Sequence, residues 1–215
     1  ERKMNTQPKK NNLMNVQYLT QLAILVAVEI VMKLIGLGSV PVGPLYMSFL
    51  TVPIAVGAIV LGPLASTILG GVFGFVSFMD AIKGASIMTS TLLGVSAIHT
   101  FILCVGMRLL MGFCVGMVSV GMKKACRNTA AGCFVTSLSA PLLNTLFFMG
   151  YIVLAFYHTD YVQSLVIAKG ATNPLMFVVL LTGVQGAVEA IVCSVAGTAI
   201  GSSVLKAMSR MNGHR

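Results

Sequence analysis

The sequence predicts an all-α integral membrane protein with six transmembrane helices and both termini in the cytoplasm. Three observations lead to this fold class: the composition, six long apolar stretches, and the placement of the cationic residues. Of the 215 residues, 57% are hydrophobic and only 9% are charged, whereas soluble domains carry about 25% charged residues. The composition therefore indicates a protein that lies in a lipid bilayer.

Six apolar stretches are candidates for membrane spans, since about 20 apolar residues cross a hydrocarbon core of ~30 Å. They are residues 17–35, 49–61, 64–79, 98–121, 129–157 and 174–205. The second carries Pro53, which favours a kink, and both the second and the third are near the lower length limit. A single re-entrant hairpin over 49–79 is the alternative. We prefer two crossings, because a re-entrant hairpin would move the first four basic residues to the outside. We expect the first span to be a retained anchor, because no small-residue cleavage motif follows it.

The 14 Lys and Arg residues are distributed unevenly along a chain with six spans. Ten of them fall on one side: Arg2, Lys3, Lys9, Lys10, Lys123, Lys124, Arg127, Lys206, Arg210 and Arg215. Lys33, Lys83 and Lys169 lie at the opposite side. By the positive-inside rule the larger group is cytoplasmic. The net charge of +9 therefore reflects topology and a weak attraction to anionic lipid, and not nucleic-acid binding.

This pattern predicts one membrane domain over residues 1–215. A basic cytoplasmic arm covers 1–16, the six-helix bundle covers 17–205, and a cytoplasmic tail covers 206–215. Between the third and fourth spans, Asp80–Ala97 is the longest outer connection, and we expect it to hold a short helix across the mouth of the bundle.

Small residues at four-residue spacing predict close helix contacts. Pairs of this kind are Ala23/Ala27, Gly70/Gly74, Gly112/Gly116 and Gly197/Gly201. For the alanine pair two interpretations remain open: a face that packs on a neighbour in the same chain, which is the more common case for such a pair, or a docking face for a separate membrane subunit. On the same helix, Glu29 and Lys33 have the order and spacing of an i,i+4 ion pair. We interpret them as a structural pair, with a ligand contact as the alternative.

Arg108 is the most informative single residue, because it falls near the middle of the fourth span. About ten residues, or ~15 Å of helix, separate it from the outer end. A guanidinium group cannot lose its charge, so it must face a partner or water. Glu189, Glu29 and the anionic group of a ligand are the candidate partners, and a ligand could share an Arg108–Glu189 pair.

Polar groups on the neighbouring spans predict a pocket that opens outward. Asn144 and Gln185 have interhelical hydrogen bonds as their ordinary explanation, and together with Arg108 and Glu189 they would line such a pocket. Lys83 and Tyr46, with His99, sit around its expected mouth, where surface exposure is the ordinary explanation for each.

The sequence contains no catalytic or metal-binding motif that we can identify. HExxH, Gly-x-Ser-x-Gly and Walker sequences are absent. The five cysteines lack CxxC spacing. We therefore predict no enzyme activity, no metal and no cofactor, and expect any ATP hydrolysis to come from other subunits.

The first-helix alanines, the block FLTVPIAVGAIVLGPLASTILGGVFGFVSF and the segment PLLNTLFFMG resemble the S components of energy-coupling factor (ECF) transporters. The resemblance covers about residues 17–205. It implies the high-affinity substrate-binding subunit of an ATP-driven vitamin uptake transporter in a prokaryotic cell membrane. The implied partners are a transmembrane coupling subunit and two ATPase subunits.

The resemblance also implies where the two contact regions lie. The coupling subunit would meet Ala23 and Ala27. The substrate would sit under the first and third outer-side loops and between helices four to six. By region alone, this maps onto Tyr46, Lys83, Arg108, Asn144 and Glu189. The amino-terminal Met and following His of the metal-transporting branch are not matched here.

The fixed cation of Arg108, with Lys83 near the mouth, favours a carboxylated vitamin such as pantothenate. The sequence has no Trp and few aromatic residues, which gives less support to a large stacked ring system. Riboflavin, folate or another vitamin or nucleobase-like substrate is the alternative. A membrane enzyme or a purely structural subunit is more distant, because the polar residues do not gather at the bilayer boundary and a structural role would not explain Arg108 and Glu189 at mid-depth.

Overall fold

The computed structural model describes residues 10–38, 40–42, 45–126 and 128–213, and side chains over most of that range. Its elements in chain order are α1 (Lys10–Leu34), β1 (Val40–Val42), β2 (Leu45–Met47), α2 (Thr51–Val60), α3 (Pro63–Ile82), α4 (Ile87–Val95), α5 (Ala97–Phe101), the π-helical turn η1 (Ile102–Gly106), α6 (Met107–Ala125), α7 (Thr129–Phe156), α8 (Asp160–Ala168) and α9 (Pro174–Gly213). The predicted helical class is confirmed, with one addition. A small antiparallel hairpin of β1 and β2, in which Val40 pairs with Met47, follows the first helix.

Five helical stretches are long and apolar enough to cross a membrane: Val16–Leu34, Pro63–Ile82, Ala97–Ala125, Thr129–Phe156 and Pro174–Arg210. The predicted second span is shorter than the others. Helix α2 has 10 residues, or ~15 Å of helix, about half of a hydrocarbon core. Pro53 stands in its first turn, where a missing N–H is tolerated, and residues 51–59 are all buried. Length and composition thus support five spans, and α2 is a short helix buried within the bundle.

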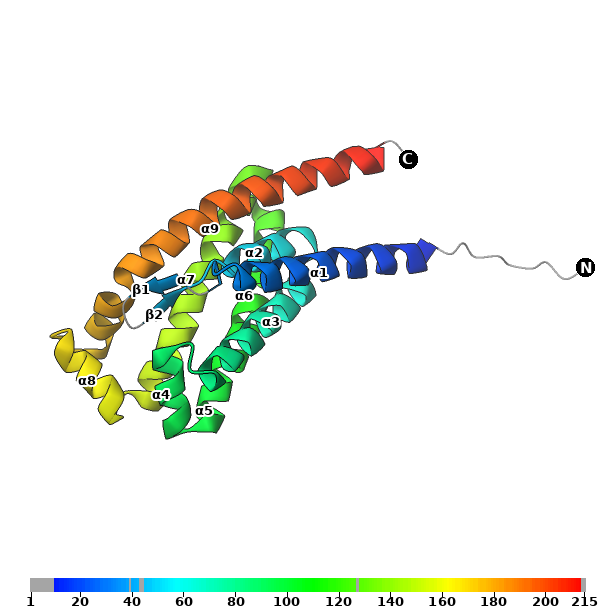
Figure 1. Ribbon diagram of the computed structural model, residues 1–215. Coiled ribbons are helices and arrows are strands. Elements are labelled where there is room, and N and C mark those ends of the chain that lie inside the picture. Colours follow the sequence, from blue (N-terminus) through cyan, green and yellow to red (C-terminus); the bar gives the residue numbers. More distant parts are fainter. Residues whose placement is uncertain (1–9, 39, 43–44, 127, 214–215) are drawn as a thin grey trace, which may run out of the picture.

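The helices run back and forth between two ends of the bundle (Figure 1). The amino end of α1 and the carboxyl end of α9 lie at one end, and the hairpin, α4, α5 and α8 lie at the other. The turn between α2 and α3 belongs to the first end. There Gly62 adopts a φ of 95°, which glycine allows without strain, and Pro63 begins α3.

Helices α3 and α6 touch through their glycines, as predicted. A methyl group added at Gly70 would overlap the carbonyl oxygen of Arg108, and one at Gly112 would overlap that of Ser66. The same closeness occurs at the second glycine of each pair, Gly74 and Gly116. We call this contact the glycine seam; it fixes the backbone of α6 against that of α3.

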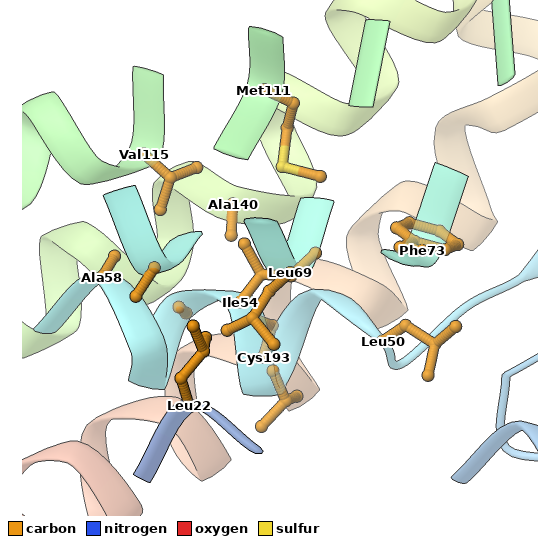
Figure 2. Packing of buried hydrophobic residues seen from close by; sticks show 13 residues of the cluster. Leu22, Leu50, Ile54, Ala58, Leu69, Phe73, Met111, Val115, Ala140 and Cys193 are labelled. Carbon is orange, nitrogen blue, oxygen red and sulfur yellow. The ribbon is translucent and has the colours of Figure 1, made fainter. Parts of the chain in front are cut away.

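Two clusters of buried apolar side chains form the core. The first surrounds α2, with Ile54, Leu69 and Met111 among its members (Figure 2). The second lies toward the end that carries α4 and α8, and includes Met88, Ile152 and Phe177. Because α2 is so short, the space beyond its amino end is left for other side chains.

Helix α1 lies at the edge of the bundle and packs against α2 and α3. Leu22 is buried, but Ala23 and Ala27 are exposed. The small-residue face of α1 is therefore open in the isolated chain and does not pack on a neighbouring helix of it.

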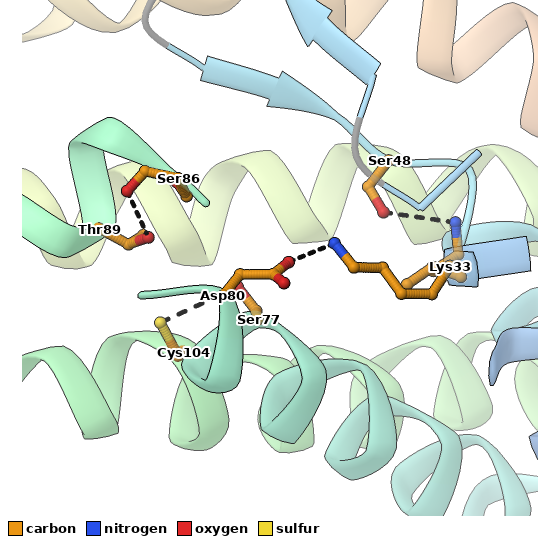
Figure 3. A network of polar contacts seen from close by, with 8 residues as sticks. Lys33, Ser48, Ser77, Asp80, Ser86, Thr89 and Cys104 are labelled. Carbon is orange, nitrogen blue, oxygen red and sulfur yellow. Dashed lines mark hydrogen bonds and ion pairs between the residues drawn. The ribbon is translucent and has the colours of Figure 1, made fainter. Parts of the chain in front are cut away.

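The predicted Glu29–Lys33 pair is wrong. The Nζ atom of Lys33 forms an ion pair with the Oδ2 atom of Asp80, in the last turn of α3 (Figure 3). Glu29 is only 1% exposed, and neither of its carboxylate oxygens has a hydrogen-bond partner in the described part of the chain. Lys33 stands at the partly exposed end of α1, where an ion keeps some of its water and is less costly to hold than deep in the bundle.

Candidate ligand-binding site

A cavity of about 90 Å³ lies between the two apolar clusters. Its walls come from α3, α4, α6, α7 and α9, and from the segments on both sides of the hairpin. A single water needs roughly 10–15 Å³ of such space, so the cavity can hold several waters or a small ligand. Phe73 and Leu50 of the first cluster and Met88 and Met149 of the second form its apolar surface.

Arg108 faces this cavity from α6 and is 7% exposed. Its Cζ atom lies 4.3 Å from the ring centroid of Phe73 and 4.8 Å from that of Phe148, within the range of cation–π attraction. Its Nη1 atom donates to the carbonyl oxygen of Cys104 at 3.2 Å. Its Nε atom is buried and has no partner among the described residues. The guanidinium therefore keeps donors that a ligand could use.

The backbone places this side chain through two local features. The π-helical turn η1 ends two residues before Arg108, and such turns within α-helices are frequent at functional sites. The glycine seam then holds the carbonyl of Arg108 directly against Gly70. The position of the guanidinium thus depends on a contact between two backbones.

Glu189 faces the same cavity from α9 and is 3% exposed. Its Oε1 atom accepts a hydrogen bond from the backbone N–H of Ser48 at 2.7 Å and one from Nε2 of Gln185 at 3.4 Å. The Arg108–Glu189 ion pair, one of the partnerships that the sequence left open for Arg108, does not form in the described part of the chain. The reason is that each group is held elsewhere: Glu189 by the segment after β2, and Arg108 by two aromatic rings.

Asn144 and Gln185 line the cavity together with Arg108 and Glu189. These four residues come from three helices, and the structure brings them together as the sequence predicted. The Oδ1 atom of Asn144 is buried without a hydrogen-bond partner among the described residues, so it is an acceptor that a ligand could use. Two other predicted residues do not contribute in the same way. Lys83 is exposed and does not line the cavity, and the side chain of Tyr46 lies outside the described residues.

Several cavity residues were not predicted from the sequence. They are Ser48, Phe73, Asp80, Phe148 and Thr182. Asp80 had a usable signal, because it is a carboxylate at the predicted end of a span, opposite a lysine at the end of another. The two Phe residues gave no such signal, since each lies in an apolar stretch whose other members are ordinary core residues.

The cavity is covered by the first and second outer connections. Gly38 and Ser48 contribute from the first. From the second come Ser86 and Thr89: Ser86 directly precedes α4, the short helix predicted within Asp80–Ala97, and Thr89 lies in it. The third outer connection contributes no lining residue, contrary to what the resemblance implied. Its helix α8 places Val162 and Val166 in the second apolar cluster.

In the described part of the chain, no group of three or more His, Cys, Asp or Glu side chains could hold a metal ion.

The chain was also compared with known proteins. No curated protein matches it. Residues 17–200 match the family described as "ECF transporter, substrate-specific component".

Proposed function

The chain belongs to the family of ECF transporter substrate-specific components, and from this premise we propose that its cavity binds a carboxylated water-soluble vitamin such as pantothenate. The family and the long apolar helices make the chain a multi-pass membrane protein and the substrate-binding subunit of an ECF transporter. Such a subunit works with the transmembrane and ATPase components and takes up a small molecule. The identity of that molecule is the proposal.

The proposal depends mainly on the environment of Arg108. Arg108 is a permanent cation whose side chain is buried and lines the cavity, and its Nε donor has no partner among the described residues. A buried charge is costly unless it is paired, and no carboxylate of the described chain pairs with it. A carboxylate on the substrate would supply the missing partner through charge-assisted hydrogen bonds.

The remaining polar groups favour a substrate that also carries hydroxyl or amide groups. Glu189 offers acceptors, Asn144 offers both acceptor and donors, and Thr182 offers a hydroxyl. Pantothenate has one carboxylate, one amide and two hydroxyls, and no ring. Riboflavin and folate need aromatic surfaces for stacking, but the rings of Phe73 and Phe148 lie against Arg108.

A binding experiment on the detergent-solubilised protein tests this assignment. The ligands are pantothenate, the alcohol in which CH₂OH replaces its carboxylate, riboflavin and folate. A ligand present at 100 times its dissociation constant stabilises the folded state by about 2.7 kcal/mol, so thermal unfolding reports binding. We expect stabilisation by pantothenate and much less by the alcohol. Equal binding of both, or binding of riboflavin alone, would overturn the proposal.

We also propose that the amino end of α1 and the carboxyl end of α9 are both cytoplasmic. This is expected if the chain crosses the membrane six times, with the short α2 as one of the crossings. The location of Lys123 and Lys124 at the same end supports this orientation. A cysteine introduced at the exposed position of Lys124 should resist a membrane-impermeant thiol reagent in intact cells. Labelling of that cysteine beyond the level of the unmodified chain, which is the control, would show that this end of the bundle faces the outside.

A further inference from the structure

We propose that Glu29 is a proton-binding site: it holds a proton whenever α1 packs on the bundle, which makes the packing of α1 dependent on pH. Glu29 is 1% exposed and lies in α1 one turn deeper than Lys33. It does not line the cavity that Arg108 faces, so this inference is independent of the proposed vitamin binding.

The side chains around Glu29 on its own helix are apolar. The face of α1 that meets the bundle carries Leu22, a member of the first apolar cluster, and Leu25, Val26 and Met32, which pack against that cluster. Glu29 is three or four residues from the last three of these and shares their face. Neither of its carboxylate oxygens has a hydrogen-bond partner among the described residues. The carboxyl group is therefore separated both from water and from protein donors.

The helices that pack against α1 bring no counter-charge to Glu29. They are α2 and α3, and every residue of both helices lies within the described part of the chain. Helix α2 has no titratable side chain. The titratable side chain of α3 is Asp80, a second carboxylate, which forms the ion pair with Lys33. An ionised Glu29 would thus lie in an apolar cluster without a cation beside it.

Two other titratable side chains belong to the first apolar cluster or pack against it, and neither donates to Glu29. Tyr18 lies about three turns before Glu29 on α1. Cys193 of α9 donates from its Sγ atom to the carbonyl oxygen of Ser137 at 3.1 Å. The carboxylate of α9, Glu189, lines the cavity described above.

A proton is the ligand that these surroundings fit. A buried charge without a partner is far more costly than a neutral polar group, and one proton converts the carboxylate into a neutral acid. A metal cation such as Ca²⁺ or Mg²⁺ would need several further oxygen ligands, whereas Glu29 has no polar partner in the described chain. Ionisable groups within membrane helices are rare, and binding a proton is one of their uses.

The proton links the packing of α1 to pH with a definite sign. While α1 is packed, Glu29 keeps its proton. When α1 leaves the bundle, or when the chain unfolds, the carboxyl group meets water and ionises at about pH 4.3. The packed state then binds one proton more than the open state, so it loses stability as the pH rises above that value. One proton shifts the equilibrium by at most about tenfold for each pH unit.

Thermal unfolding of the detergent-solubilised full chain between about pH 5 and pH 8 tests this link. Glu29→Gln carries a neutral amide of the same size at every pH. Relative to this variant, the unfolding equilibrium constant of the unmodified chain should rise by up to about tenfold per pH unit. The matched control, Asp160→Asn, removes an exposed carboxylate from α8 and should keep the pH dependence of the unmodified chain. The same pH dependence in Glu29→Gln as in the unmodified chain would overturn the proposal.

Infrared spectroscopy of the folded protein reads the protonation state itself. At neutral pH the unmodified chain should show a C=O stretching component of a neutral carboxylic acid. Glu29→Gln and Glu29→Met should both lack that component, and Asp160→Asn should keep it. Glu29→Met also covers the case in which the amide does not fold, because its apolar side chain of similar length suits the apolar cluster. If the folded chain lacks the component, or if both Glu29 variants retain it, Glu29 does not hold the proton.

Discussion

The glycine seam and the cavity lined by Arg108 share helices α3 and α6, but they are built in opposite ways. At the seam the backbones of α3 and α6 touch, and a single added methyl group would overlap Arg108 or Ser66. At the cavity, Phe73 and Asp80 of α3 and Arg108 of α6 line open space together with side chains of α4, α7 and α9. The comparison shows that the rigid contact positions the guanidinium: Arg108 has its backbone in the seam, and its side chain lines the cavity.

Gly112→Ala should have the largest effect, because its added methyl group would meet the carbonyl of Ser66. Backbone cannot give way as a flexible side chain does, so we expect a loss of at least about 1–3 kcal/mol in unfolding free energy, the usual range for overpacking. Gly121→Ala is the matched control on the same helix, since nothing lies within 4 Å of a methyl group there. Thermal unfolding of both variants in detergent would measure the difference. Equal stability would mean that the seam is looser than described.

The ion pair between Lys33 and Asp80 should matter less. Both side chains are partly exposed, at 22% and 18%, and ion pairs in contact with water contribute roughly 0–1 kcal/mol. Asp80→Asn should therefore lower stability by at most about 1 kcal/mol. The same change removes a negative charge from the cavity wall, so binding of a carboxylated ligand should strengthen.

Lys83→Met is the control for this second prediction, because Lys83 is exposed near the same end and does not line the cavity. It should leave stability and binding unchanged. Weaker binding of the carboxylated ligand in Asp80→Asn would show that Asp80 contacts the ligand directly as an acceptor.

The smallest effect on the isolated protein should come from Ala27→Leu. Ala27 is exposed on α1, so a larger side chain meets no neighbour and stability should stay within about 0.5 kcal/mol. Substrate binding should also persist. If α1 docks on the coupling subunit through small residues, the same change should reduce co-purification and transport.

Ala199→Leu places the same larger side chain at an exposed alanine of α9 and should leave assembly intact. Unchanged co-purification in Ala27→Leu would reject this face as the docking surface.

Sequence patterns predicted the parts of this fold that repeat locally. Apolar runs located the long helices, although α1 begins seven residues before the predicted span and α9 ends eight residues after it. The glycine spacing predicted close helix contacts at the residues of the seam, but not which helices would meet. The short helix α2 was predicted less well, because a run of apolar residues does not show whether the helix crosses lipid or fills a protein core. Four cavity residues, including Arg108 and Glu189, were recognisable because polar groups in apolar helices are rare.

The partners of those residues could not be predicted in the same way. Which ions pair depends on where helix ends meet in space: Lys33 lies 47 residues from Asp80 and four from Glu29, yet it pairs with Asp80. Likewise the acceptor role of Glu189 depends on the backbone of Ser48, 141 residues away. Every residue except proline has a backbone N–H, so the residue type at position 48 does not indicate this contact.

The most direct test of Arg108 as the carboxylate-binding group compares two ligands on two proteins. Dissociation constants of pantothenate and of its alcohol analogue would be measured for the unmodified chain and for Arg108→Gln. A charge-assisted hydrogen bond contributes about 1.5–3 kcal/mol, so the unmodified chain should prefer pantothenate by ~10- to 150-fold. Arg108→Gln should remove most of that preference while affinity for the alcohol changes little. Because Glu189 is held by Ser48 and not by Arg108, the variant should remain folded, which thermal unfolding without ligand would check. If the folded variant kept the full preference for pantothenate, Arg108 would not be the group that binds the carboxylate.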